Sequence, residues 1–174
     1  MQDLWVFGYG SLMWRPGFAF EEAVPARVHG LHRSLCVYSF HHRGTPEKPG
    51  LVLGLDQGGS CRGLAFRVAP KDREETIAYL REREQVTMVY REVERRARLD
   101  DGSGRAITVL TYVVNHGHEQ YAGVLPLERL VEMVARSAGQ SGPNRDYVLN
   151  TAAHLDELGI HDPTLSAVAK HLPE

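Results

Sequence analysis

The sequence predicts an α+β protein in which a curved, mostly antiparallel sheet or small barrel packs against flanking helices. Segments rich in β-branched and aromatic residues, separated by glycine and proline, fill the first half of the chain. One helical pattern interrupts these strands, and the C-terminal third is helical throughout. Strands followed by helices, without a repeat or a linker, are typical of a single α+β domain, here expected to span residues 1–174.

The expected strands alternate apolar and polar residues or form short apolar runs. They are residues 4–7, 24–39, 51–55, 61–68, 88–99 and 105–114. The sequence Gln-Gly-Gly-Ser at 57–60 favours a hairpin turn between the third and fourth strands. A second glycine-rich turn, residues 100–104, is expected to join the last two strands.

Helices are expected where apolar residues recur with the helical period. The first follows Pro70 and covers residues 71–85, and the others cover about 127–138, 144–158 and 163–172. Asp162 followed by Pro163 is a good start for the last helix, because aspartate caps the first N–H groups and proline suits the first helical position.

Composition and charge exclude several classes of protein. The formal net charge of −2, with both signs interspersed, gives no electrostatic case for a nucleic acid or acidic lipid partner. No apolar run approaches the roughly 20 residues of a membrane span, and the N-terminus does not resemble a signal peptide. Two cysteines in unrelated contexts favour a reducing compartment. We therefore expect a cytoplasmic protein.

Two glycines separated by one tyrosine follow the first strand. Such a turn can point successive N–H groups at one spot and bind a carboxylate or phosphate, although a plain turn capped by Ser11 fits the same residues. A dinucleotide-binding fingerprint is excluded because Met13 stands where its third glycine is needed. A serine nucleophile elbow is excluded because Tyr9 and Met13 replace the glycines that must flank Ser11.

Glu84 is the candidate acid or base. A rotation of roughly 100° per residue places it in the same helical stripe as Ile77 and Leu80, so it points inward from the last turn of the first helix. A carboxylate in this position is either held by an arginine or partly desolvated, which raises its pKa and makes it a usable base. The alternatives are pairing with Arg83 or Arg91, or an early end of the helix.

Other candidate residues are ambiguous. Arg43 lies in the loop 40–50, where prolines fix the backbone, and either contacts a substrate or belongs to a structural crossover. Tyr147 either places its hydroxyl in a cleft or is a half-buried aromatic residue. No histidine or cysteine spacing predicts a metal centre, since His116 and His118 lack a third ligand.

Five short motifs in the same order resemble the ChaC family of γ-glutamylcyclotransferases, which are glutathione-specific enzymes. The resemblance covers most of the chain up to about Leu158. The motifs are Val6-Phe7-Gly8-Tyr9-Gly10-Ser11-Leu12 followed by Trp14; His42-Arg43-Gly44 with Pro46 and Lys48-Pro49-Gly50; Tyr79-Leu80 with Arg83-Glu84; Tyr121-Ala122-Gly123 with Pro126-Leu127-Glu128; and Ser141-Gly142 with Asn144 and Tyr147.

The resemblance implies a small curved β-barrel with flanking helices and a lyase that cleaves glutathione to 5-oxoproline and cysteinylglycine. It implies that the glycine turn holds the γ-glutamyl group through backbone N–H groups, that Glu84 is the general base, and that no cofactor takes part. The expected substrate contacts are Tyr9, Gly10, Ser11 and Leu12, with Arg43 and Tyr147 in second place.

Two rival functions remain open at this point. The same scaffold could cyclise other γ-glutamyl amino acids or γ-glutamylamines, because specificity lies in the far part of the pocket. A non-catalytic binding or regulatory protein linked to cation transport is the second rival, and it would leave Glu84 exposed and paired. The expected partner is a small-molecule substrate, and the sequence makes no prediction of oligomeric state.

Overall fold

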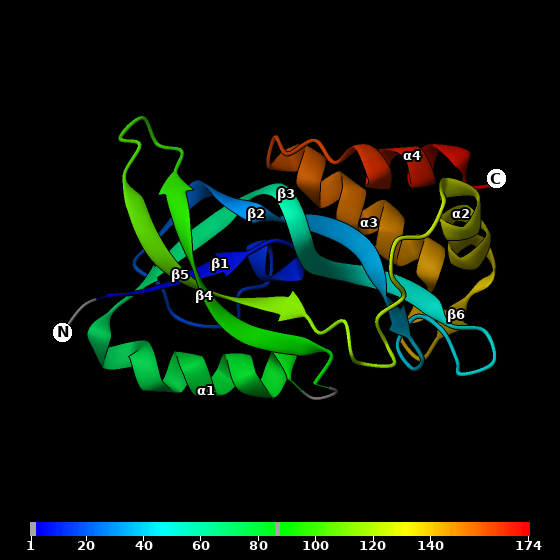
Figure 1. Ribbon diagram of the computed structural model, residues 1–174, viewed down its shortest axis with the longest axis horizontal. Helices are drawn as coiled ribbons and strands as arrows, with labels where there is room; N and C mark the ends of the chain where they lie inside the picture. The colour runs from blue at the N-terminus through cyan, green and yellow to red at the C-terminus, as the bar shows by residue number, and fades with distance from the viewer. Residues whose placement is uncertain (1–2, 86–87) are drawn as a thin grey trace. The chain divides into compact units, whose positions relative to one another are not determined.

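Within the described residues, 3–85 and 88–174 of a computed structural model, five strands close into a barrel. The order around the barrel is β1-β3-β2-β4-β5, and helices accompany it, which confirms the predicted α+β class. The strands are β1 (Leu4–Gly8), β2 (Glu22–Ser39), β3 (Gly50–Val68), β4 (Tyr90–Leu99) and β5 (Ala106–Val114). Figure 1 shows β4 and β5 as two long, adjacent ribbons.

The chain divides into two compact units. The barrel unit comprises Met1–His32 and Leu55–Asn115, and the helical unit comprises Arg33–Gly54 and His116–Glu174. The boundary falls within β2 and within β3, so each of these strands contributes residues to both units. A single domain over the whole chain stays a prediction.

Strand β1 closes the barrel because it pairs along both edges. It runs antiparallel to β3 and parallel to β5, with Val6 opposite both Phe66 and Leu110. All five residues of β1 are buried, which explains why its sequence is a continuous apolar run without alternation.

One core cluster of the barrel unit packs the helix α1 (Arg73–Glu84) against strands β1, β3 and β5. A short 3₁₀ turn, η2 (Pro70–Asp72), leads into α1, and Leu80 on this helix is fully buried. Its buried neighbours are all apolar except for one tyrosine hydroxyl: Leu4, Val6, Leu12, Phe66, Val68, Leu110 and Tyr112. The apolar stripe of α1 therefore packs as its period predicts.

The predicted hairpin at residues 57–60 is wrong, because β3 is one continuous strand. Gly58 and Gly59 have φ angles of 101° and 68°, so the pair adopts a left-handed backbone inside the strand. The Nδ1 atom of His32 donates a hydrogen bond to the Gly58 carbonyl oxygen at 3.0 Å. Two glycines in the left-handed region locally bend a strand without reversing it, as in a β-bulge.

The helical unit packs α2 (Leu127–Arg136), α3 (Asn144–Glu157) and α4 (Pro163–His171) against one another. A two-residue ladder, β6 (Ala138–Gly139) with β7 (Gly142–Pro143), connects α2 to α3. The predicted cap of α4 is confirmed, since the Asp162 carboxylate accepts a hydrogen bond from the Leu165 N–H at 3.0 Å. Figure 1 shows α3 and α4 side by side.

Asn144 links the first turn of α3 to the start of β3 by two hydrogen bonds. Its side chain is completely buried, its Oδ1 accepts from the Leu51 N–H at 2.9 Å, and its Nδ2 donates to the Leu51 carbonyl at 2.8 Å. The amide thus completes the hydrogen bonding of one strand residue in the way that a neighbouring strand would.

In the part of the chain that the structure describes, no helix has the length and hydropathy needed to cross a membrane. Both cysteines, Cys36 in β2 and Cys61 in β3, are buried, with exposed fractions of 0% and 2%.

Replacing Asn144 by alanine is expected to lower the free energy of unfolding by about 2–4 kcal/mol, because both backbone groups of Leu51 would be buried without a partner. Urea denaturation followed by circular dichroism measures the loss. Asn150→Ala, on the exposed face of the same helix, is the matched control and is expected to change stability by less than about 0.5 kcal/mol. Equal losses in the two variants would contradict this role for Asn144.

Candidate functional site

A tight turn follows β1 and carries the predicted anion-binding residues. It is the 3₁₀ turn η1 (Ser11–Met13), in which the Met13 N–H donates to the Gly10 carbonyl at 2.9 Å. The N–H groups of Ser11 and Leu12 open this turn and therefore have no acceptor within it. Ser11 is exposed and Leu12 is buried, so the turn is anchored in the core while its serine faces outward.

Gly8 lets the turn fold back over the end of its own strand. A Cβ atom at this position would lie 3.1 Å from the Leu12 Cβ and 3.4 Å from the Met13 backbone nitrogen, which is tighter than ordinary contact. A larger residue at Gly8 would therefore require the Leu12 side chain to shift by a few tenths of an ångström.

Glu84 is the last residue of α1, and its side chain is only 16% exposed. Burial raises the pKa of the carboxyl, and the nearby Arg83 guanidinium, 3.6 Å away, partly offsets this increase. The predicted inward orientation is confirmed. The pairing with Arg83, which was expected as an alternative to it, is present as well. Because desolvation is the larger effect, the carboxyl has a higher proton affinity than an exposed glutamate.

Arg83 joins the turn to the end of α1. Its Nη2 donates to the Ser11 Oγ at 3.0 Å, and its Nη1 donates to the Arg15 carbonyl at 2.5 Å. The same Nη1 also donates to the Pro16 carbonyl at 3.3 Å and to the Tyr79 hydroxyl at 3.0 Å. One guanidinium thus contacts the turn, the loop that follows it, and the helix.

A second network lies beside Glu84, on β4 and β5. The Tyr112 hydroxyl donates to the Glu92 carboxylate at 2.8 Å, and Arg81 binds the same carboxylate through two nitrogens at 3.1 and 3.0 Å. Hydrogen bonds from Arg81 lower the pKa of Glu92, while burial raises the pKa of Tyr112, with a contribution from Glu84. Tyr112 therefore stays protonated and close enough to Glu84 to interact with it electrostatically.

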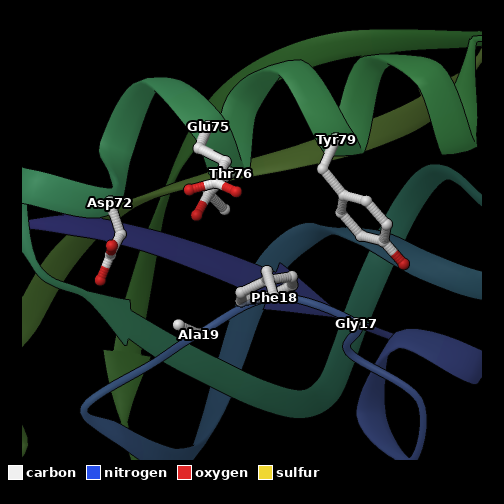
Figure 2. A pocket seen from close by; sticks show the side chains of 7 residues that line it. All are labelled: Gly17, Phe18, Ala19, Asp72, Glu75, Thr76 and Tyr79. Atoms are coloured by element: carbon white, nitrogen blue, oxygen red, sulfur yellow. The ribbon is translucent and has the colours of Figure 1, made fainter.

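A pocket of about 180 Å³ opens along the same helix, away from these residues. Figure 2 shows Tyr79 pointing from α1 toward the loop at Gly17, to the right of Phe18 in this view. Gly17 has a φ of +74°, and a Cβ there would lie 2.0 Å from the Tyr79 hydroxyl. Neither the glycine turn nor Glu84 lines this pocket, but Tyr79 does line it and accepts a hydrogen bond from Arg83.

The helical unit brings Arg43 and Tyr147 together. The guanidinium carbon of Arg43 lies 5.7 Å from the centre of the Tyr147 ring, and its Nη1 donates to the Pro143 carbonyl at 3.2 Å. The Tyr147 hydroxyl accepts from the Leu53 N–H at 2.9 Å, and burial raises its pKa to about 12. Tyr147 is thus half-buried, and its hydroxyl binds the backbone of β3.

The sequence singled out Glu84 and the turn, and the structure brings them into one network within the barrel unit. Sequence reasoning missed the bridging role of Arg83 and the pair Tyr112 and Glu92. The available signal for that pair was weak: both residues lie in strands whose alternation predicts one inward and one outward face.

Chemically, the barrel-unit site offers a turn with N–H donors, a buried carboxylate of raised pKa and an arginine between them. This set can bind an anionic group and move a proton. Across the described residues, no three histidine, cysteine or acidic side chains gather as ligands for a metal ion.

Comparison with known proteins gives relatives over nearly the whole chain. A glutathione-specific γ-glutamylcyclotransferase of Escherichia coli K12 is 31% identical over 163 residues, covering 94% of this chain and 70% of the relative. The human protein named glutathione-specific γ-glutamylcyclotransferase 1 is 32% identical over 171 residues, covering 96% of this chain and 77% of the relative.

A solved structure supports the fold. The crystal structure of a yeast γ-glutamylcyclotransferase specific to glutathione has a TM-score of 0.85, covering 98% of this chain and 95% of the yeast chain at 24% identity. The protein family described as ChaC-like protein matches residues 4–174. With this match and relatives above 30% identity across the same length, the chain belongs to the ChaC-like family.

Proposed function

We propose that this protein is a γ-glutamylcyclotransferase that converts glutathione to 5-oxoproline and cysteinylglycine. The observation that carries the proposal is the buried carboxylate of Glu84, which Arg83 links to the glycine turn after β1. The names of the relatives support glutathione as the substrate. The reaction needs one proton acceptor and one holder for the γ-glutamyl group, and these two features meet both needs.

Ring closure is an intramolecular reaction. The α-amine and the γ-carbonyl belong to one γ-glutamyl group, so the protein has to orient them but does not have to supply a nucleophile. The amine attacks the carbonyl carbon, a C–N bond forms, and the amine loses a proton to Glu84. The bond to the cysteinyl nitrogen then breaks, and the same proton is returned to that nitrogen.

The raised pKa of Glu84 suits both steps. A carboxylate with an ordinary pKa would be a weak base near neutral pH, whereas burial makes this one a stronger acceptor that keeps the proton until the departing nitrogen takes it. The neutral Tyr112 and the Arg81–Glu92 ion pair add no uncompensated charge beside it.

The turn holds the other end of the γ-glutamyl group. The N–H groups of Ser11 and Leu12 bind the α-carboxylate, with Tyr9 and Gly10 shaping the approach to the turn. A donor of this kind that stabilises the developing oxyanion contributes about 3–4 kcal/mol in well-studied enzymes. Arg43 and Tyr147 remain second candidates for substrate contact.

The two rival functions differ in their support. Cyclisation of other γ-glutamyl compounds uses the same turn and the same base, so only the names of the relatives favour glutathione over it. A non-catalytic regulatory protein has no need of a desolvated carboxylate, and the burial of Glu84 argues against it.

Glu84→Gln is expected to lower kcat for glutathione by roughly 10²–10⁴-fold, because the amide cannot accept the amine proton. Release of 5-oxoproline measures the loss, and isothermal titration should show that glutathione still binds. Glu82→Gln, on the exposed face of the same helix, is the matched control and should keep wild-type turnover. Wild-type turnover in the Glu84 variant would remove Glu84 from the mechanism.

The same substitution is expected to stabilise the fold as the pH rises. The folded-state pKa of Glu84 is raised, so the favourable contribution of its neutral form is present at low pH and is lost as the pH rises through that pKa. Glutamine cannot ionise and keeps the neutral state. Thermal melts should show Glu84→Gln gaining stability over the wild type between acidic and neutral pH, and a difference that does not vary with pH would contradict the raised pKa.

Substrate choice is tested by supplying purified protein with glutathione and, separately, with γ-glutamylalanine. We expect 5-oxoproline from glutathione and a much lower kcat/KM for the dipeptide, since recognition of the tripeptide requires contacts beyond the γ-glutamyl group. Equal or greater turnover of γ-glutamylalanine would favour the wider cyclotransferase activity. No 5-oxoproline from either compound would favour the non-catalytic alternative.

A further inference from the structure

Arg83, in the last turn of α1, contacts several residues outside its own turn of helix. Its guanidinium contacts a side chain of the glycine turn, two backbone carbonyls of the following loop, a tyrosine on its own helix and the carboxylate of Glu84. The side chain is only 23% exposed, so most of its surface is covered by other residues.

We propose that Arg83 is a positioning residue that fixes the substrate-binding turn against the end of α1 and places its positive charge beside the carboxylate of Glu84. The inference rests on the proposed function, because it gives Arg83 a role between the turn that binds the γ-glutamyl group and the base that takes its proton. In this scheme Arg83 acts through Ser11 and Glu84 and not on the reacting amine or carbonyl.

The geometry of the guanidinium explains why arginine is needed for the first role. Its Nη2 reaches the Ser11 Oγ while its Nη1 holds the Arg15 and Pro16 carbonyls, so two nitrogens of one rigid plane bind two separate segments. The Ser11 contact joins residues 72 positions apart in the chain. A lysine has one nitrogen and cannot make both sets of contacts at once.

The second role follows from charge. Arg83 is the one cation within ion-pair distance of the Glu84 carboxylate among the described residues, at 3.6 Å. Tyr112 on β5 also interacts electrostatically with Glu84 and stays neutral. It donates a hydrogen bond to Glu92 on β4, whose charge Arg81 on α1 balances. Burial favours the protonated form of Glu84, and the positive charge of Arg83 limits that preference.

The two roles belong to one side chain, which couples recognition to chemistry. A substrate carboxylate that docks at the turn comes close to the guanidinium that Ser11 binds, and it competes for the same positive charge. That competition reduces the electrostatic stabilisation of the Glu84 carboxylate by Arg83. The pKa of Glu84 then rises, so it is a stronger base when the substrate is in place.

The test uses two substitutions that separate the roles. Arg83→Lys keeps the charge and loses the two-segment contact, while Arg83→Gln loses the charge. Carbon-13 NMR of protein labelled at glutamate carboxyl groups follows the titration of Glu84, whose signal is assigned by its loss in Glu84→Gln. Steady-state assays of 5-oxoproline release give kcat and KM for the same proteins.

We expect Arg83→Gln to move the Glu84 titration to higher pH, and the acidic limb of the kcat profile to move with it. Arg83→Lys should leave the titration near its wild-type position and raise KM about tenfold, the size expected for losing a charge-assisted hydrogen bond. Arg73→Gln removes the same charge from the first turn of α1 and is expected to change neither quantity. Circular dichroism checks that each variant is folded.

A double-mutant cycle tests the link to the turn. Ser11→Ala and Arg83→Lys each remove the same hydrogen bond, so their effects on KM should be strongly non-additive. Additive effects on KM, or a Glu84 titration that does not move in folded Arg83→Gln, would overturn the positioning role.

The titration does not depend on turnover. If the wild type released no 5-oxoproline but Arg83→Gln still moved the Glu84 titration, the proposed function would fail while the effect of Arg83 on Glu84 stood. If glutathione were cleaved normally and the titration did not move, the proposed function would stand and the positioning role would fail.

Discussion

The barrel unit depends on one constraint: β1 must pair along both of its edges. Its antiparallel partner β3 and its parallel partner β5 come from distant parts of the chain, and only their simultaneous pairing closes the sheet. A short strand surrounded in this way has no solvated face, so all of its residues are apolar or glycine. Because β1 ends at Gly8, closure of the barrel also fixes where the turn at Ser11 begins.

Much of the fold follows from patterns that each segment carries by itself. Apolar periodicity gave the helix that ends at Glu84, and the aspartate–proline pair gave the start of α4. The hairpin at 57–60 failed for a physical reason. Two adjacent glycines permit a left-handed backbone, but that conformation serves a bend within a long strand as readily as a reversal, and neighbouring strands decide between them.

The site shows the same division between local and distant information. The inward position of Glu84 is a property of one helical stripe, so the sequence contains it. The direction of the long Arg83 side chain cannot be inferred from its own helix, because its partners are a serine and two carbonyls far away in the chain. The dyad of Tyr112 and Glu92 likewise requires the register of β4 against β5, which alternation alone does not supply.

The burial of both cysteines has a consequence for redox chemistry. A mixed disulfide with a thiol tripeptide requires that a protein sulfur be reached by solvent and ionise to a thiolate, and Cys36 and Cys61 are both buried. A protein proposed to process glutathione binds such a thiol at its own site. Because its sulfur atoms are shielded by the strands that carry them, its own thiols stay out of that exchange.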